Sequence, residues 1–212
     1  MFNPLETLVI CIILHLSLIS CANFSYDHDY QNASMAQSKG SYKKAEEFLE
    51  QSQKSLSELL WLELQTGTNT YLNSKNFKKA AKHIDEMEKR VKKGDYISKK
   101  NTFFDHDCRV DYCLAKLRYF LTMGRYNEAI LFLTNNKNMY HDSLKTYHSG
   151  WQMHYRLLEW GYLGAAYALK GEPNETKKYI QKFDDYYQSL RKSQLEPHGP
   201  GQKQDRKNDR LL

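Results

Sequence analysis

The chain has 212 residues, of which 41% are hydrophobic and 13% aromatic, enough to bury the core of one domain. It contains only 10 Gly and 4 Pro. It also lacks alternating Val, Ile and Thr runs bounded by turn residues, which argues against a β-sheet and predicts an all-α fold. The net charge of +6 comes from 31 basic and 25 acidic residues scattered together, so the sequence lacks the clustered Lys and Arg of a nucleic-acid-binding face.

The chain begins with an apolar segment. Residues 8–20, LVICIILHLSLIS, have the length of a secretory h-region and are too short to span a bilayer as a helix. The run leads into LISC, which resembles the lipobox of bacterial lipoproteins, in which the cysteine thiol, here that of Cys21, is acylated. Ser20-Cys21-Ala22 also fits ordinary signal cleavage, which would release a soluble chain beginning at Asn23. We favour the lipobox, because cysteine is an uncommon residue beside a cleavage site. An uncleaved hydrophobic anchor is a third alternative and would give the same topology.

The same segment predicts where the protein resides. Ala22, in place of Asp after Cys21, resembles the pattern that sorts lipoproteins to the bacterial outer membrane. Several acyl chains, at about 0.8 kcal/mol per buried CH2, would hold the protein to a bilayer essentially permanently. We therefore expect an outer-membrane lipoprotein that faces the periplasm. Its predicted parts are a signal peptide at 1–21, a flexible tether at 22–37, a helical domain at 38–192 and a disordered tail at 193–212. A short helix around residues 32–38 at the end of the tether is an alternative.

Helical periodicity begins at Gly40. This turn glycine is followed by aromatic Tyr42, small Ala45 and apolar Leu49, which predicts the second helix of a helical hairpin. The segment before Gly40 is a poor helix, so we expect only half a unit here. A second unit, with both helices, spans residues 64–87.

Two further units follow breaks in the periodicity. The first break covers residues 94–104, and a third unit then runs over 107–134, with the turn sequence GRYNEAI. A second break at 135–149 precedes a fourth unit at 160–183. We expect the last helix, 174–192, to end the row of units.

The fourth unit is the most informative. In WGYLGAAYALKGEPNETKKYIQKF, bulky Trp160, Leu163 and Tyr167 surround small Gly164 on the first helix. This resembles the tetratricopeptide pattern W-x2-L-G-x2-Y, which is followed by a small residue on the second helix. The resemblance implies helix-turn-helix repeats stacked as a short right-handed solenoid, and a plain bundle of helix pairs is the alternative. The small second-helix residues are 35, 49 and 47 positions apart, against 34 in the family: Ala45, Ala80, Ala129 and Thr176.

The resemblance also implies a concave groove lined by the first helix of each unit. Most of its lining would be apolar, which favours an amphipathic helix or an extended apolar peptide of another protein as the ligand. A further surface is open to two interpretations, because Trp151 and Tyr155 either pack in the core or offer a partner an exposed anchor. The groove positions carried over are Leu62, Gln65, Asn69 and Leu72, then Asp111, Leu114, Arg118 and Leu121, and last Leu158, Gly161, Ala165 and Ala168.

The sequence carries no catalytic signature. The tripeptide DHD occurs at 27–29 and at 105–107, but neighbours in sequence point in different directions, and we expect Asp107 to cap the following helix. Cys108 and Cys113 are two buried thiols or, in an exported protein, an oxidised pair. We therefore expect no enzymatic activity, no cofactor, no metal and no nucleic acid.

Two hypotheses describe the function. The first is a membrane-tethered periplasmic scaffold that holds a component of an envelope assembly, such as a secretion or pilus system. In architecture it is similar to the small lipoproteins that pilot such assemblies. The second is an immunity or inhibitor lipoprotein that neutralises one periplasmic toxin or hydrolase with nanomolar or tighter affinity.

The lipobox hypothesis predicts covalent acylation at one atom. In cells given a radioactive fatty acid, the wild-type protein should carry the label, because the Cys21 thiol accepts an acyl chain. The Cys21→Ser variant should carry none, as read from the labelled band on a gel. A wild-type protein without label would rule out the lipobox.

Overall fold

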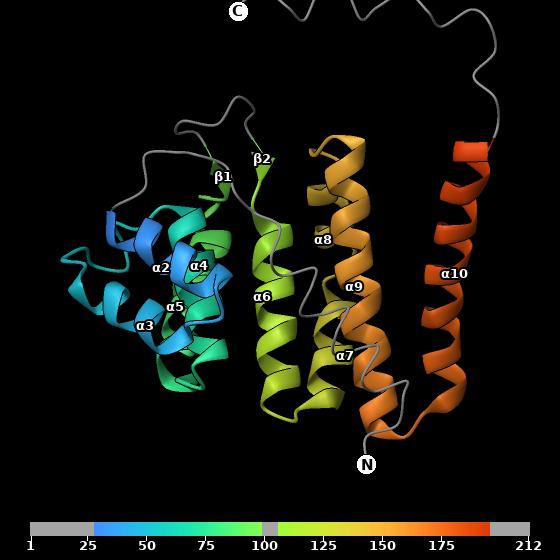
Figure 1. Ribbon diagram of the computed structural model, residues 1–212, viewed down its shortest axis with the longest axis horizontal. Helices are drawn as coiled ribbons and strands as arrows, with labels where there is room; N and C mark the ends of the chain where they lie inside the picture. The colour runs from blue at the N-terminus through green and yellow to red at the C-terminus, as the bar shows by residue number, and fades with distance from the viewer. Residues whose placement is uncertain (1–27, 99–105, 196–212) are drawn as a thin grey trace, which may run out of the picture.

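The computed structural model describes residues 28–98 and 106–195 (Figure 1). These residues form nine α-helices and one pair of two-residue antiparallel strands, so the prediction of an all-α fold is confirmed. The elements are α2 (His28–Ser38), α3 (Tyr42–Gln51), α4 (Trp61–Asn73), α5 (Phe77–Lys93), β1 (Ile97–Ser98), β2 (His106–Asp107), α6 (Arg109–Thr122), α7 (Tyr126–Asn135), α8 (Lys137–Leu144), α9 (Ser149–Lys170) and α10 (Pro173–Leu195).

Four helical hairpins, α2–α3, α4–α5, α6–α7 and α9–α10, turn in the same way. The residue at each turn has a left-handed backbone, with φ of 72° at Gly40, 64° at Lys75, 71° at Gly124 and 82° at Gly171. The next residue in each turn donates its N–H to the carbonyl five positions earlier, at 2.8–2.9 Å, which closes the first helix in a Schellman motif. The four bonds are Ser41 to Ala36, Asn76 to Tyr71, Arg125 to Phe120 and Glu172 to Tyr167.

A small buried residue follows each of these turns by five positions. Ala45, Ala80 and Ala129 are fully buried, and Thr176 is 5% exposed. A small side chain here lets the second helix approach the first closely. The four residues are those that the repeat pattern aligned.

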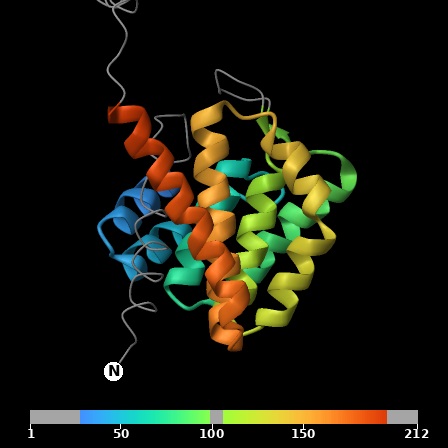
Figure 2. The same ribbon diagram turned by 90° about the vertical axis from the view of Figure 1, so that its right-hand side faces the viewer.

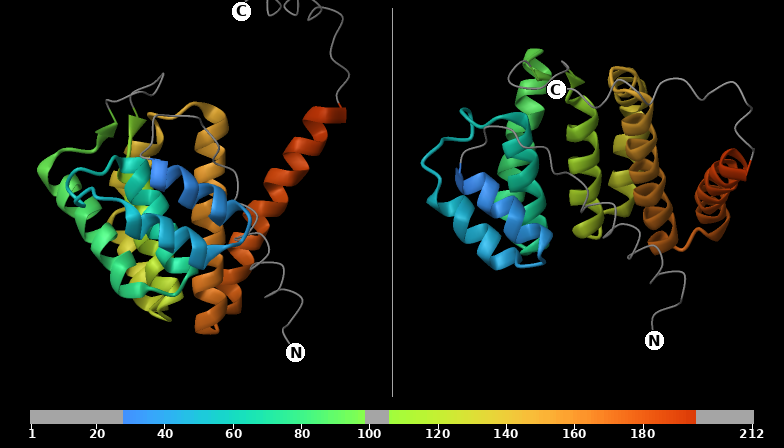
Figure 3. Two further views of the ribbon diagram at one scale, coloured as in Figure 1. Left: turned by 60° about the vertical axis from the view of Figure 1, so that its left-hand side comes forward. Right: turned by 45° about the horizontal axis from the view of Figure 1, so that its top comes forward.

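The hairpins pack side by side in chain order. The first helices contact one another in the succession α2, α4, α6, α9, and each second helix also packs on the next first helix, α3 on α4, α5 on α6 and α7 on α9. Figure 1 shows this row, from α2 and α3 at one end to α10 at the other. Helix α8 lies against α6 and α7. Helix α10 lies across α9 and diverges from it toward its own C-terminal end (Figures 2 and 3).

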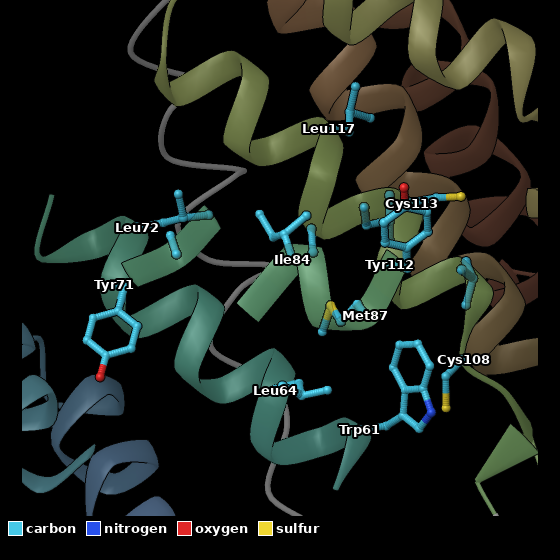
Figure 4. Close-up of a cluster of buried hydrophobic side chains, with 14 of the residues drawn as sticks. Trp61, Leu64, Tyr71, Leu72, Ile84, Met87, Cys108, Tyr112, Cys113 and Leu117 are labelled. Carbon is cyan, nitrogen blue, oxygen red and sulfur yellow. The ribbon is translucent and has the colours of Figure 1, made fainter. Parts of the chain in front are cut away.

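The hydrophobic core runs through the interfaces between hairpins. Figure 4 shows one part of it, where side chains from α4, α5 and α6 meet. Leu64 of α4, Met87 of α5 and Leu117 of α6 are fully buried there. Cys108 and Cys113 are fully buried too, and burial raises the pKa of the free Cys113 thiol to about 12. Cys113 therefore acts as a small apolar side chain.

The described part of the expected tether at 22–37 is helical, and the helix begins earlier than the short one expected around residues 32–38. From His28 on, this segment is the helix α2, with Tyr30, Ala33 and Ala36 buried against the core. The spacing of these three residues, one every three positions, places them on one face that packs on α3 and α4. The first unit is thus a complete hairpin and not half a unit.

Both predicted breaks contain structure. The first includes β1, which pairs with β2 through Ile97 opposite Asp107. The second contains α8, and α9 begins at Ser149, well before the predicted start at Trp160. Among the described helices none is long and apolar enough to cross a bilayer. The predicted signal segment, Cys21 and the chain beyond 195 lie outside the described residues.

One close contact inside the second hairpin yields a test of the packing. A Cβ atom added to Gly67 would lie 2.5 Å from two atoms of the buried His83 ring. We expect Gly67→Ala to lower the free energy of unfolding by about 1–3 kcal/mol, the usual cost of overpacking, as measured by urea denaturation.

The control is Gly150→Ala. Its added Cβ would lie 3.7 Å from His148, an ordinary van der Waals contact. Because alanine favours a helix over glycine, this variant should keep or slightly raise the stability of the wild type. An equal loss of stability in both variants would contradict the packing described.

Candidate functional site

The predicted groove positions lie on α4, α6 and α9, three first helices that pack in succession. Leu72 and Leu114 are 3% and 6% exposed and belong to the hydrophobic core, so they support this face instead of lining it. Asp111, Gly161 and Ala165 are also buried, whereas Ala168 is exposed. The half-buried positions, which can reach a surface, are Leu62, Gln65, Asn69, Arg118, Leu121 and Leu158. We call these six residues, Asp111 and the side chains bonded to them the α4–α6–α9 face.

Arg118 bridges two helices of this face. Its Nη1 donates to Oδ1 of Asn69 and its Nη2 to Oδ1 of Asn73, both at 2.6 Å. The two asparagines are one helical turn apart on α4, so one planar guanidinium bonds both. Burial raises the pKa of Tyr162 on α9, and the positive charge of Arg118 opposes that rise. The charge of Arg118 therefore lies close enough to α9 to affect the pKa of a residue on that helix.

The partners of Arg118 are neutral. Within residues 28–98 and 106–195, no carboxylate lies close enough to form an ion pair with it. The side chain is half-buried. The α4–α6–α9 face thus holds a cation whose charge is not balanced by an adjacent anion of the described chain.

Asp111 joins the same three helices two turns earlier on α6. Its carboxylate is 7% exposed. Oδ1 accepts hydrogen bonds from the Tyr155 hydroxyl at 2.7 Å and from Nε2 of Gln65 at 3.2 Å, and Oδ2 accepts one from the Tyr147 hydroxyl at 3.2 Å. These bonds reach α4, α9 and the segment before α9, and they satisfy a buried charge.

The two tyrosines remain hydrogen-bond donors at neutral pH. Burial raises the pKa of Tyr147 and of Tyr155, and the nearby charge of Asp111 raises both further. Their ring centroids are 4.8 Å apart in an edge-to-face arrangement. The pair therefore donates to Asp111 as one preorganised unit.

Trp151 lies one helical turn before Tyr155 on α9. The structure separates the two residues that the sequence left open, because Tyr155 is 8% exposed and Trp151 is 39% exposed. The indole contacts the rings of His148, His154 and Tyr155. Trp151 is thus held by its neighbours while more than a third of it stays accessible, as a binding anchor requires.

The described residues carry no cluster suited to metal binding. Among them, no group of three or more His, Cys, Asp or Glu side chains could hold an ion. Asp107 lies one residue before Cys108, the N-cap of α6, and its Oδ1 accepts the N–H of Arg109, the first residue of the helix, at 3.0 Å. A hollow of about 420 Å³ lies on α5, away from the predicted groove, and five charged side chains of that one helix line it: Asp85, Glu88, Lys89, Lys92 and Lys93.

Sequence reasoning missed two residues of this face. Asn73 is the last residue of α4 and stands four positions after Asn69 on the same helical face, and that spacing was the available signal. Tyr147 lies in a predicted break, where periodicity carries no information. Both residues bond side chains more than 30 positions away in the chain, and no local pattern reports such pairs.

The Asp111 contacts predict a large effect on stability. Asp111→Ala removes one acceptor from three donors, two of them buried tyrosine hydroxyls, so the free energy of unfolding should fall by about 2–4 kcal/mol in urea denaturation. Asp142→Ala is the matched control. Asp142 is an exposed residue of α8 that pairs with Lys145, and surface pairs contribute about 0–1 kcal/mol. Similar losses in both variants would show that Asp111 does not hold the three helices together.

The chain was also compared with known proteins. No family model, curated protein or solved structure matches it.

Proposed function

We propose that this chain is a tetratricopeptide-like helical-repeat scaffold that binds another protein on the α4–α6–α9 face. Four hairpins with the same left-handed turn, the same closing hydrogen bond and a small residue at the same position support a repeat. The contacts between successive first helices support a stack, which we propose to be a short right-handed solenoid. A plain bundle of helix pairs does not require the same turn geometry in all four hairpins.

The observation that carries the proposal is the composition of this face. Three half-buried leucines, Leu62, Leu121 and Leu158, stand on three different helices. Beside them stand polar groups held in place by hydrogen bonds between helices, above all Arg118 and Gln65. Apolar contact area with a few oriented polar groups suits a helix or an extended segment of a protein partner.

The proposed location follows from the N-terminal segment. If Cys21 is acylated, six residues lie between it and His28, where α2 begins, and the seven residue steps from Cys21 to His28 span at most about 25 Å. The scaffold would then stand close to the outer membrane, on its periplasmic side. We propose that its partner is a component of an envelope assembly, with a periplasmic toxin or hydrolase as the alternative.

Capture of the partner tests the proposal. Full-length protein crosslinked in its own cells and identified by mass spectrometry should yield one dominant protein partner. Leu121→Glu should reduce that capture by at least about tenfold, because a carboxylate at this position removes apolar contact and costs desolvation. Circular dichroism should show unchanged helicity.

The control carries the same substitution elsewhere. Leu131 of α7 is 59% exposed and lies outside the α4–α6–α9 face, so Leu131→Glu should capture the partner as the wild type does. Capture that survives Leu121→Glu, or that Leu131→Glu abolishes equally, would overturn the proposed face.

A further inference from the structure

The electrostatics of the α4–α6–α9 face say more about the partner, provided that the proposed function holds. Of the predicted groove positions only Asp111 and Arg118 are charged. They lie two helical turns apart on α6, about 10 Å along its axis. Asp111 is buried and already accepts three hydrogen bonds. The carboxylate of Asp111 is therefore already bonded within the fold, whereas the guanidinium of Arg118 has no anionic partner among the described residues.

Arg118 retains capacity for a further partner. A guanidinium has five N–H donors, and the bonds to Asn69 and Asn73 use two of them. Both acceptors are neutral amides, which fix the plane of the group but do not balance its charge. Removing a cation from water costs free energy, which an adjacent anion offsets at least in part.

The surroundings of Arg118 indicate what must accompany the anion. Leu121 lies one turn further on the same helix, and Leu158 lies on α9. Both are half-buried and pack against the core. A ligand that covers Arg118 and its helical neighbour Leu121 meets apolar surface as well as charge, so a protein segment fits this position better than a free ion does. One cation without neighbouring Lys or Arg on this face is also too little charge for a nucleic acid.

We infer that the partner presents an apolar helix face that carries one Asp or Glu, whose carboxylate pairs with Arg118. Guanidinium and carboxylate match as two parallel N–H to O bonds, and such charge-assisted bonds are among the strongest in proteins. Asn69 and Asn73 hold the guanidinium before binding, which lowers the entropy lost on association. The leucines provide apolar contact area, and Arg118 makes binding selective for a partner that carries an acidic residue at the matching position.

A displayed peptide library tests this inference. Random 16-residue peptides, fused at their C-terminal end to a phage coat protein so that they offer no free carboxyl terminus, are selected on the full-length chain in detergent. Sequences enriched on the wild type should combine apolar residues at helical spacing with one Asp or Glu. Selection on Arg118→Gln should retain the apolar pattern and lose the acidic residue.

A double-mutant cycle then measures the pair itself. Changing the acidic residue of an enriched peptide to its amide should weaken binding to the wild type about tenfold, which corresponds to about 1.4 kcal/mol. The same change should have no effect on binding to Arg118→Gln. Because the cycle compares two peptides on one protein variant, a general loss of stability in Arg118→Gln cancels.

The outcomes separate this inference from the proposed function. Enriched apolar peptides without an acidic residue, or an equal amide effect on both proteins, would overturn the role of Arg118 while leaving the α4–α6–α9 face as the binding surface. Absence of enriched peptides on the wild type would overturn both.

Discussion

Close approach of the two helices in each hairpin is the constraint on which the structure depends. The left-handed turn residue ends the first helix, and the N–H of the following residue reaches back to its last turn. The chain then needs a small residue five positions after the turn, or the helices would be held apart. Three hairpins use alanine. The fourth uses Thr176, whose hydroxyl donates to the Glu172 carbonyl at 2.9 Å and so remains satisfied while buried.

Hydrogen bonds between hairpins fix the relative arrangement of the helices, which apolar packing alone does not fix. Leucine and alanine contacts tolerate small rotations of one helix against the next, whereas a buried carboxylate tolerates few positions of its donors. Asp111 therefore ties α4, α6 and α9 to one relative arrangement. Arg118 does the same between α4 and α6, but with neutral acceptors. Helix α6 thus carries two charged groups two turns apart. The charge of Asp111 is satisfied within the fold, and the charge of Arg118 remains available to a ligand.

Much of the fold could be predicted from the sequence, because its determinants are local. Gly40, Gly124 and Gly171 mark turns by backbone chemistry alone, and the spacing of small and bulky residues around them reports which helix faces meet. Lys75 shows the limit of that argument, since it adopts the same left-handed backbone, with φ of 64°, without being glycine. Only the second half of α2 is expected from the sequence, because the buried face of this helix consists of Tyr30, Ala33 and Ala36, and two alanines give almost no apolar signal.

The sequence by itself determined that the chain folds into helical hairpins and where most of them turn. It could do so because each of these properties depends on residues within about one or two helical turns. Only the tertiary structure decided that Leu72 and Leu114 are core, that Trp151 is accessible, and that Arg118 is bonded by Asn69 and Asn73. Burial and hydrogen bonding between helices depend on how hairpins 35 to 49 residues apart in the chain are placed. A pattern of neighbouring residues does not report contacts over such separations.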